Sequence, residues 1–271
     1  MTEDRPAATV SILGVPIAAL SFEQAVQLFL DAPTAGQRIG AHLCTTHTLV
    51  EATHDGYLRT ALLSGMALPD GVPLVWVGRA RGARMERVCG LDLMPALMDR
   101  GRRLGARHYL YGGAPGTPEL LADRLRALYS GLIVVGLDSP PFRPLSEDER
   151  IATISRINAA RPDFVWVGLG TPKQDYWVAE YRPHLEAPAV LAVGAAFDIV
   201  SGRRRRAPVL MQRVGAEWLF RLALEPSRLW RRYLRANTLF VWLAARESIA
   251  VRRRPSQDGD PGRHPPREPG A

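Results

Sequence analysis

The sequence predicts an α/β fold: a Rossmann-like, mostly parallel sheet with helices on both faces, followed by a C-terminal helical appendage. Strand-like runs alternate with helix-like segments up to about residue 193 of the 271-residue chain. Several of these runs are continuously apolar, which is typical of parallel strands covered on both faces. From about residue 211 the pattern changes to arginines interleaved with aromatic and aliphatic residues.

Local signals define the first elements. Short β-like runs at 9–13 and 15–19, separated by one glycine, predict a hairpin. Ser21, with Gln24 three residues later, has the spacing of a capping box and predicts a helix to about residue 30.

Beyond this start, strands and helices are expected to alternate. Apolar runs predict strands at 41–46, 66–68, 108–111, 132–137, 163–167 and 189–193. Helices are predicted at 47–64, 91–104, 118–129 and 146–160, and after Pro172. Ser146 and Glu149 have the spacing of a second capping box. Glycines follow at least three of the strands. Because ligands bind at the carboxyl ends of the strands in such sheets, we expect the site at this edge.

Composition divides the chain into four parts. Residues 1–8 are expected to form a flexible N-terminus, 9–210 a Rossmann-like catalytic core, 211–254 a basic amphipathic helical appendage and 255–271 a disordered tail. Pro226 is expected to divide the appendage into at least two helices.

The positive charge is concentrated in one segment. The net charge is +8, but residues 1–202 carry a net −2, whereas residues 203–254 hold 14 arginines against three glutamates. Such a segment calls for an anionic partner, which could be nucleic acid, anionic lipid or a diphosphate. Arg228, Arg231 and Arg232 recur at helical spacing, so in a helix they form a cationic stripe beside apolar residues.

Composition and motifs argue against several classes of protein. Cys44 and Cys89 are the only cysteines, so no disulfide framework is implied, and neither has companions at metal-ligand spacing. We expect no secretory signal, and no apolar run reaches the roughly 18 residues that span a membrane. No strand is followed by a G-x-G-x-x-G motif, which argues against a dinucleotide-dependent oxidoreductase.

Three short motifs at strand ends carry candidate chemistry. Asp70 lies on a turn just past a predicted strand, where a carboxylate can act as a general base. Gly112 and Gly113 follow another strand and leave backbone N–H groups open to a phosphate. Lys173, the only lysine in the chain, and Gln174 begin a helix after a third strand. Taken singly, each motif also fits an ordinary turn.

Seven short motifs follow one another in a fixed order over roughly residues 10–245. They are Leu68-Pro69-Asp70-Gly71, Glu86-Arg87-Val88-x-Gly90-x-Asp92-Leu93, Gly112-Gly113-x-Pro115-Gly116, Gly168-Leu169-Gly170-x-Pro172-Lys173-Gln174, Phe197-Asp198, Arg206-Ala207-Pro208 and Glu217-Trp218-Leu219-x-Arg221-Leu222-x-x-Glu225-Pro226-x-Arg228. Together they resemble the WecG/TagA/CpsF glycosyltransferases (glycosyltransferase family 26).

The resemblance implies inverting transfer from a UDP-sugar to a polyprenyl-diphosphate-linked sugar, with no cofactor and no obligatory metal. It implies two catalytic residues, Asp70 as the general base and Arg87, with Arg87, Arg228, Arg231 and Arg232 holding phosphates. The further substrate-binding candidates are Thr45, His47, Gly90, Asp92, Gly112, Gly113, Lys173, Gln174, Asp198 and Arg206. His47 and Asp175 stand where the family usually has asparagine and glutamate.

We therefore expect a hexosyltransferase that moves a ManNAc-type or glucose-type sugar in cell-surface polysaccharide or teichoic acid biosynthesis. Its expected partners are the UDP-sugar, the lipid-linked acceptor and the inner face of the cytoplasmic membrane, where it would be peripheral, but no nucleic acid. The alternative is a non-catalytic membrane- or nucleic-acid-binding protein that uses the basic segment. The sequence leaves open the sugar, the polymer and whether the chain forms a homo-oligomer.

Overall fold

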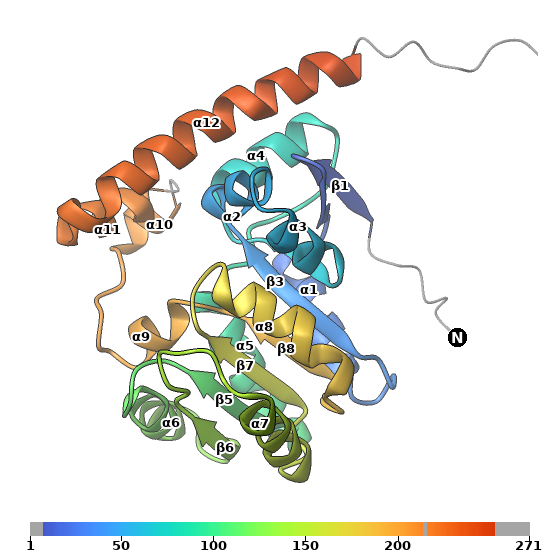
Figure 1. Cartoon of the computed structure of the whole chain (residues 1–271), viewed down its shortest axis with the longest axis vertical. Helices are drawn as coiled ribbons and strands as arrows, with labels where there is room; N and C mark the ends of the chain where they lie inside the picture. Colours follow the sequence, from blue (N-terminus) through green and yellow to red (C-terminus); the bar gives the residue numbers. More distant parts are fainter. Residues whose placement is uncertain (1–7, 214–215, 253–271) are drawn as a thin grey trace, which may run out of the picture.

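The computed structural model describes residues 8–213 and 216–252, and one eight-stranded sheet lies at its centre (Figure 1). The strand order is β1-β2-β4-β3-β8-β7-β5-β6. Only β1 and β2 pair antiparallel, and the other neighbours are parallel. The predicted α/β fold with a mostly parallel sheet is confirmed.

The bounds of the elements follow the predicted alternation. The strands are β1 (Thr9–Ile12), β2 (Val15–Ala18), β3 (Ile39–Cys44), β4 (Met66–Pro69), β5 (Arg107–Gly112), β6 (Ile133–Asp138), β7 (Phe164–Gly168) and β8 (Ala189–Ala192). The helices are α1 (Phe22–Asp31), α2 (Thr46–Ala52), α3 (Gly56–Leu63), α4 (Val72–Ala80), α5 (Gly90–Gly101), α6 (Thr117–Leu128), α7 (Glu147–Ala159), α8 (Lys173–Tyr181), α9 (Ala196–Val200), α10 (Val209–Arg213), α11 (Glu217–Leu224) and α12 (Pro226–Arg252), with single 3-10 turns at Arg102–Leu104 and Arg182–His184.

The two predicted capping boxes form as their spacing indicates. Ser21 accepts a hydrogen bond from the backbone of Gln24, whose side chain accepts one from the Ser21 backbone, and this begins α1. Ser146 and Glu149 make the same reciprocal pair at the start of α7. The hairpin of β1 and β2 turns at Gly14, whose φ of 75° suits glycine.

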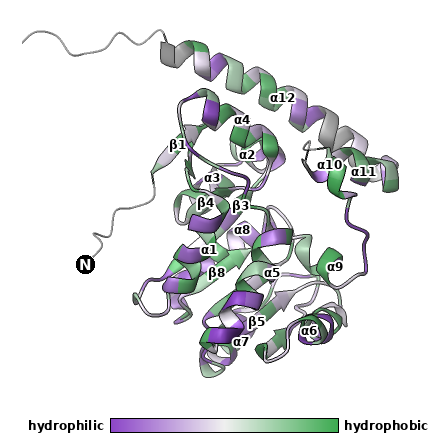
Figure 2. Ribbon diagram, turned by 180° about the vertical axis from the view of Figure 1, so that it is seen from behind, coloured by the Kyte–Doolittle hydropathy of each residue, from purple (hydrophilic) through white to green (hydrophobic). Residues whose placement is uncertain are grey.

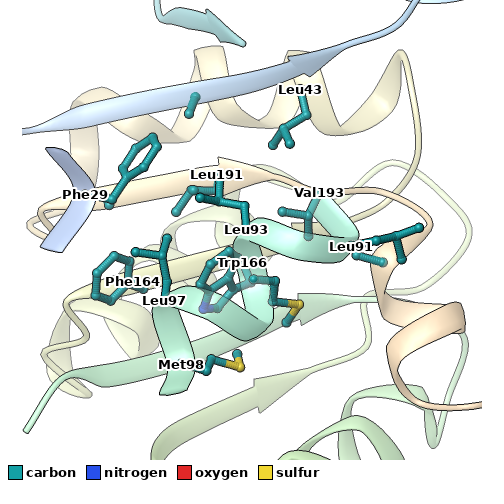
Figure 3. Close-up of a cluster of buried hydrophobic side chains, with 14 of the residues drawn as sticks. Phe29, Leu43, Leu91, Leu93, Leu97, Met98, Phe164, Trp166, Leu191 and Val193 are labelled. Atoms are coloured by element: carbon teal, nitrogen blue, oxygen red, sulfur yellow. The ribbon is translucent and has the colours of Figure 1, made fainter. Parts of the chain in front are cut away.

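The strands are covered on both faces, and β7 shows why. Successive residues of a strand point to opposite faces of the sheet. Phe164 and Trp166 pack on one face in a cluster with α1, α5 and α6, where Figure 3 shows Trp166 beside Leu97. Val165 and Val167 pack on the other face with residues of α7 and α8. A strand buried on both sides has to be apolar throughout, as its sequence is.

The chain reverses direction across the sheet between β5 and β7. β5 is followed by α6 on the face of α1 and α5, whereas its neighbour β7 is followed by α8 on the opposite face. The loops that leave the carboxyl ends of these two strands therefore diverge. Such a switch point is where open α/β sheets bind ligands.

The prediction of one helix over 47–64 is wrong, because α2 and α3 are separate. The side chain of Asp55 accepts a hydrogen bond from the backbone of Leu58 at 2.9 Å and caps α3. Asp55 also accepts one from the hydroxyl of Tyr176 in α8. The Asp55 cap is a local signal that the prediction of one helix misses, and the contact with α8 adds a tertiary constraint. Two short helices, α4 and α9, lack a side-chain N-cap and are not predicted from the sequence either.

The C-terminal helical segment consists of α10, α11 and α12, and Pro226 begins α12, which confirms the predicted division. Figure 1 shows α12 lying across the side of the molecule formed by α2 and α4. Phe240 and Ala244 of α12 are buried in a cluster that includes Leu49 of α2. Figure 2 shows hydrophobic residues along both α11 and α12 and a hydrophilic connection between α9 and α10. In the part of the chain that the structure describes, no helix combines the length and the apolar character needed to cross a membrane.

Candidate active site

Asp70 lies at the carboxyl edge of the sheet, directly after β4. Its backbone N–H donates to the carbonyl of Cys44 at 2.9 Å, which ties it to the end of the neighbouring strand β3. About a quarter of its side chain is exposed. A carboxylate that is fixed on two sides and still reachable suits proton transfer.

Arg87 reaches Asp70 because the loop between α4 and α5 runs along the end of β4. The backbone N–H of Val88 donates to the carbonyl of Pro69 at 2.9 Å, which holds this loop in place. The Nε of Arg87 then donates to the backbone carbonyl of Asp70 at 2.6 Å, and its Nη2 lies 3.5 Å from Oδ1 of Asp70. The two predicted catalytic residues therefore form one pair.

Burial and neighbouring charges act on Asp70 in opposite directions. Burial raises the pKa of its carboxyl above the ordinary value, and the charge of Glu217 adds to this rise. The guanidiniums of Arg87 and Arg221 and a hydrogen bond from the thiol of Cys89 lower the pKa again. Burial also raises the pKa of Cys89 well above its ordinary value, so this thiol stays protonated and can donate. The net effect is a pKa above the ordinary value, so the surroundings enhance the affinity of this carboxylate for a proton.

A second arginine lies beside this pair. Nη2 of Arg206 donates to Asp92 Oδ1 at 2.5 Å, and its Nε is 3.9 Å from an oxygen of Glu217. Glu217, the first residue of α11, also accepts from Nη2 of Arg87. We call Asp70, Arg87, Asp92, Arg206 and Glu217 the charged cluster. The start of α5 is held near it because Gly90 packs on Val193, where a Cβ would lie 3.3 Å away.

Glycines bring the backbones of β5 and β7 together at the switch point. Gly112 has a φ of 126°, and a Cβ there would lie 2.7 Å from the backbone of Gly168. The N–H of Gly113 donates to the carbonyl of Gly168 at 3.0 Å. A Cβ on Gly168 would in turn lie 2.4 Å from the ring of Phe197. These glycines are therefore required by the close packing of β5, β7 and α9, because a side chain at either position would clash with the protein itself.

The structure separates the two candidates at the start of α8. Lys173 is exposed. Gln174 is 3% exposed, and its side chain accepts from the N–H of Gly170 at 3.0 Å and donates to the carbonyl of Ala192 at 3.4 Å. Gln174 thus fastens the loop after β7 to the end of β8. Next to it, Asp175 lies 3.0 Å from Nδ1 of His42 in the core.

The remaining predicted site residues lie at the starts of α2 and α9 and in α12. Thr45 is the N-cap of α2, and His47 lies in its first turn, 3.7 Å from Glu51. Asp198 of α9 pairs with Arg204 at 3.2 Å. The backbone positions 228, 231 and 232 belong to α12, but the side chains of Arg228, Arg231 and Arg232 lie outside the described residues.

A cavity of about 230 Å³ lies beside the carboxyl ends of β5 and β6. Its polar lining includes Asp138 and Arg156, and Tyr111 contributes an aromatic ring. Ser139 donates to the carbonyl of Ala114 at 3.4 Å, so the cavity adjoins the loop that follows Gly112 and Gly113. A larger cavity of about 600 Å³ is lined by residues of α1, α4 and the loop after α4, and none of the predicted site residues lines it.

Three residues of the site do not stand among the predicted ones: Cys89, Glu217 and Arg221. A usable signal existed for Glu217, because it is one of only three acidic residues in a segment with 14 arginines. No signal existed for Cys89, since a buried cysteine usually packs as a small apolar residue. Within 8–213 and 216–252, no group of three or more His, Cys, Asp or Glu could hold a metal ion.

The comparisons with known proteins agree on one family. A family described as "Glycosyl transferase WecG/TagA/CpsF family" matches residues 10–254. An N-acetylglucosaminyldiphosphoundecaprenol N-acetyl-beta-D-mannosaminyltransferase of Bacillus spizizenii is 29% identical over 209 residues, which cover 76% of this chain and 79% of that protein. A protein of the same description from Bacillus subtilis is 30% identical over 211 residues, covering 76% and 80% of the two chains. The chain therefore belongs to the WecG/TagA/CpsF family and is a glycosyltransferase.

Proposed function

We propose that this chain transfers N-acetylmannosamine, or a closely related sugar, from a UDP-sugar to a sugar linked to polyprenyl diphosphate, as a step in the synthesis of a cell-surface polymer. The observation that carries the proposal is the pairing of Asp70 with Arg87 at the carboxyl edge of the sheet. The names of the two Bacillus relatives supply the acceptor and the sugar.

In this reaction Asp70 acts as the general base. It takes the proton of the acceptor hydroxyl while the hydroxyl oxygen forms a bond to the anomeric carbon, and the bond from that carbon to UDP breaks. UDP leaves with the bonding electron pair, and one displacement inverts the anomeric centre. Arginines and backbone N–H groups stabilise the charge on the leaving diphosphate in place of a metal ion.

In this proposal the donor nucleotide binds at the switch point between β5 and β7. Backbone N–H groups of the loop between β5 and the start of α6 are available to phosphates there, and the adjoining cavity of about 230 Å³ is close to the size of a nucleoside. Asp138 in its lining can accept hydrogen bonds from ribose or base.

The acceptor requires contact with a membrane, and the C-terminal helices are suited to it. Trp218, Leu219 and Leu224 of α11 and Trp230, Val241 and Trp242 of α12 are exposed. With the exposed Arg235 and Arg246 of α12, they supply the apolar and cationic groups of a surface that binds anionic lipid at the inner face of the cytoplasmic membrane.

A donor-panel assay tests the proposal. The full chain is mixed with UDP-N-acetylmannosamine, UDP-N-acetylglucosamine or UDP-glucose and a short-chain polyprenyl-diphosphate-GlcNAc, with and without EDTA, and products are weighed by mass spectrometry. The proposal expects a gain of one N-acetylhexosamine with UDP-N-acetylmannosamine that persists in EDTA. Folded protein that binds no UDP by calorimetry and yields no product would contradict it.

A further inference from the structure

Glu217 meets the two arginines of the charged cluster at once. One carboxylate oxygen accepts from Nη2 of Arg87, and the other lies 3.9 Å from Nε of Arg206. The side chain of Glu217 is only 15% exposed. Ion pairs in such partly dehydrated surroundings are screened less by salt and water than pairs on the open surface.

The arginines would serve an anionic ligand with the same N–H groups. A guanidinium binds phosphate and carboxylate with one fork-shaped geometry. Glu217 therefore occupies the position at Arg87 Nη2 that a phosphate oxygen would take, and it lies within ion-pair distance of Arg206, whose Nε makes no hydrogen bond to it. The other contacts of the two arginines, from Arg87 Nε to the Asp70 carbonyl and from Arg206 to Asp92, do not involve Glu217 and can persist when it leaves.

We propose that Glu217 is an internal competitor of the substrate's diphosphate, so that a diphosphate binding at Arg87 and Arg206 displaces the Glu217 carboxylate and releases the start of α11. The inference rests on the proposed function, in which donor and acceptor both carry a diphosphate. Because coupling between two binding events is reciprocal, a contact of α11 with the arginines weakens diphosphate binding as much as diphosphate weakens that contact.

The contacts of α12 show which part of the C-terminal segment would move. Phe240 and Ala244 are buried, and Glu247 accepts from the N–H of Leu13 at 2.9 Å and pairs with Arg81 at 3.0 Å. α11 is joined to α12 through Glu225, whose ψ of 60° interrupts the helix. Release of Glu217 would therefore shift α11 at this junction and leave the second half of α12 in place.

The first test compares binding of inorganic pyrophosphate, without divalent cations, to the full chain and to its Glu217→Gln variant by titration calorimetry. Glutamine keeps the size of the side chain but removes the competing charge, so the variant is expected to bind pyrophosphate at least about fivefold more tightly. Glu186→Gln is the matched control: it removes the charge of an exposed glutamate just before β8, at the opposite edge of the sheet from the charged cluster, and is expected to leave the affinity unchanged. Equal or weaker binding by Glu217→Gln would overturn the proposal.

The second test follows α11 itself by hydrogen exchange of residues 217–224. Pyrophosphate is expected to raise exchange there in the wild-type chain and to change it little in Glu217→Gln, where exchange is already raised. Unchanged exchange in wild-type protein saturated with pyrophosphate would refute the displacement. The donor-panel assay keeps the two proposals apart. If the chain transfers sugar but Glu217→Gln does not bind pyrophosphate more tightly, only the competitor role of Glu217 is refuted. If Glu217→Gln binds pyrophosphate more tightly but the chain transfers sugar from no donor, only the proposed reaction is refuted.

Discussion

Asp70 combines two demands on a general base that work against each other. A partly dehydrated carboxyl has a raised affinity for protons, which favours proton abstraction, but it must also be ionised to act. Arg87 resolves the conflict, because its guanidinium lowers the pKa that burial raises. Its Nε also fixes the loop to the carbonyl of Asp70, so one side chain both positions and tunes the base.

The acid limb of the pH profile of kcat/KM reports the pKa of this base. Replacing Arg87 by glutamine removes a charge that lowers the pKa of Asp70, so the limb is expected to move to higher pH. Replacing Glu217 by glutamine removes a charge that raises this pKa, so the limb is expected to move to lower pH. Initial rates of both variants across the acidic range measure the shifts. Limbs that coincide with that of the wild type would show that another group titrates.

Gly112 must be glycine because of a contact with a neighbouring strand. Alanine there would hold a φ of 126° and place its Cβ 2.7 Å from the backbone of Gly168. We expect Gly112→Ala to cost about 1–3 kcal/mol in unfolding free energy from strain, and more from the clash, and to weaken donor binding. Urea unfolding and UDP titration measure the two effects.

Gly105→Ala is the control for that substitution. Gly105 also has a positive φ, 71°, but nothing lies within 4 Å of its Cβ position. Its substitution is expected to cost less and to leave UDP binding unchanged. Equal losses for the two variants would mean that the close approach of β5 and β7 is unimportant.

At the scale of elements, α12 is part of the folded body and not only a basic surface. The side chain of Asn237 accepts a hydrogen bond from Thr46 at 3.0 Å, and Phe240 is 2% exposed against α2. Phe240→Ala is therefore expected to lower the unfolding free energy by about 3–5 kcal/mol. The adjacent Val241 is 66% exposed, so Val241→Ala is expected to change it by less than about 0.5 kcal/mol. Similar urea midpoints for both variants would contradict this packing.

Local signals predict those elements whose cause is local. The capping boxes at Ser21 and Ser146 and the helix break at Pro226 involve residues a few positions apart, and all three are confirmed. The break between α2 and α3 is an exception, because its cap at Asp55 is local and the prediction of one long helix misses it. The second contact of Asp55, with Tyr176 121 residues away, leaves no trace in a single sequence.

At the scale of the whole molecule, the sequence places the parts of the site but not their pairing. Because Asp70 and the glycines follow strands, a parallel sheet necessarily brings them to one edge. The contact between Arg87 and Glu217 spans 130 residues and needs the C-terminal segment to return to the end of β4. Gln174 is a candidate for donor binding by its position, yet the fold directs its side chain to the backbones of Gly170 and Ala192. Topology can be inferred from the sequence, whereas side-chain partners across layers cannot.

The measurement that tests the central claim most directly is sugar transfer by Asp70→Asn, with UDP binding measured on the same protein. Asparagine has nearly the same shape but cannot take a proton, so transfer is expected to fall by about 10²–10⁴-fold while UDP binding is retained. Asp99→Asn, a change at a partly exposed residue of α5, is expected to transfer at the wild-type rate. Transfer by Asp70→Asn within a few-fold of wild type would contradict the account, because the proton would then go to another group.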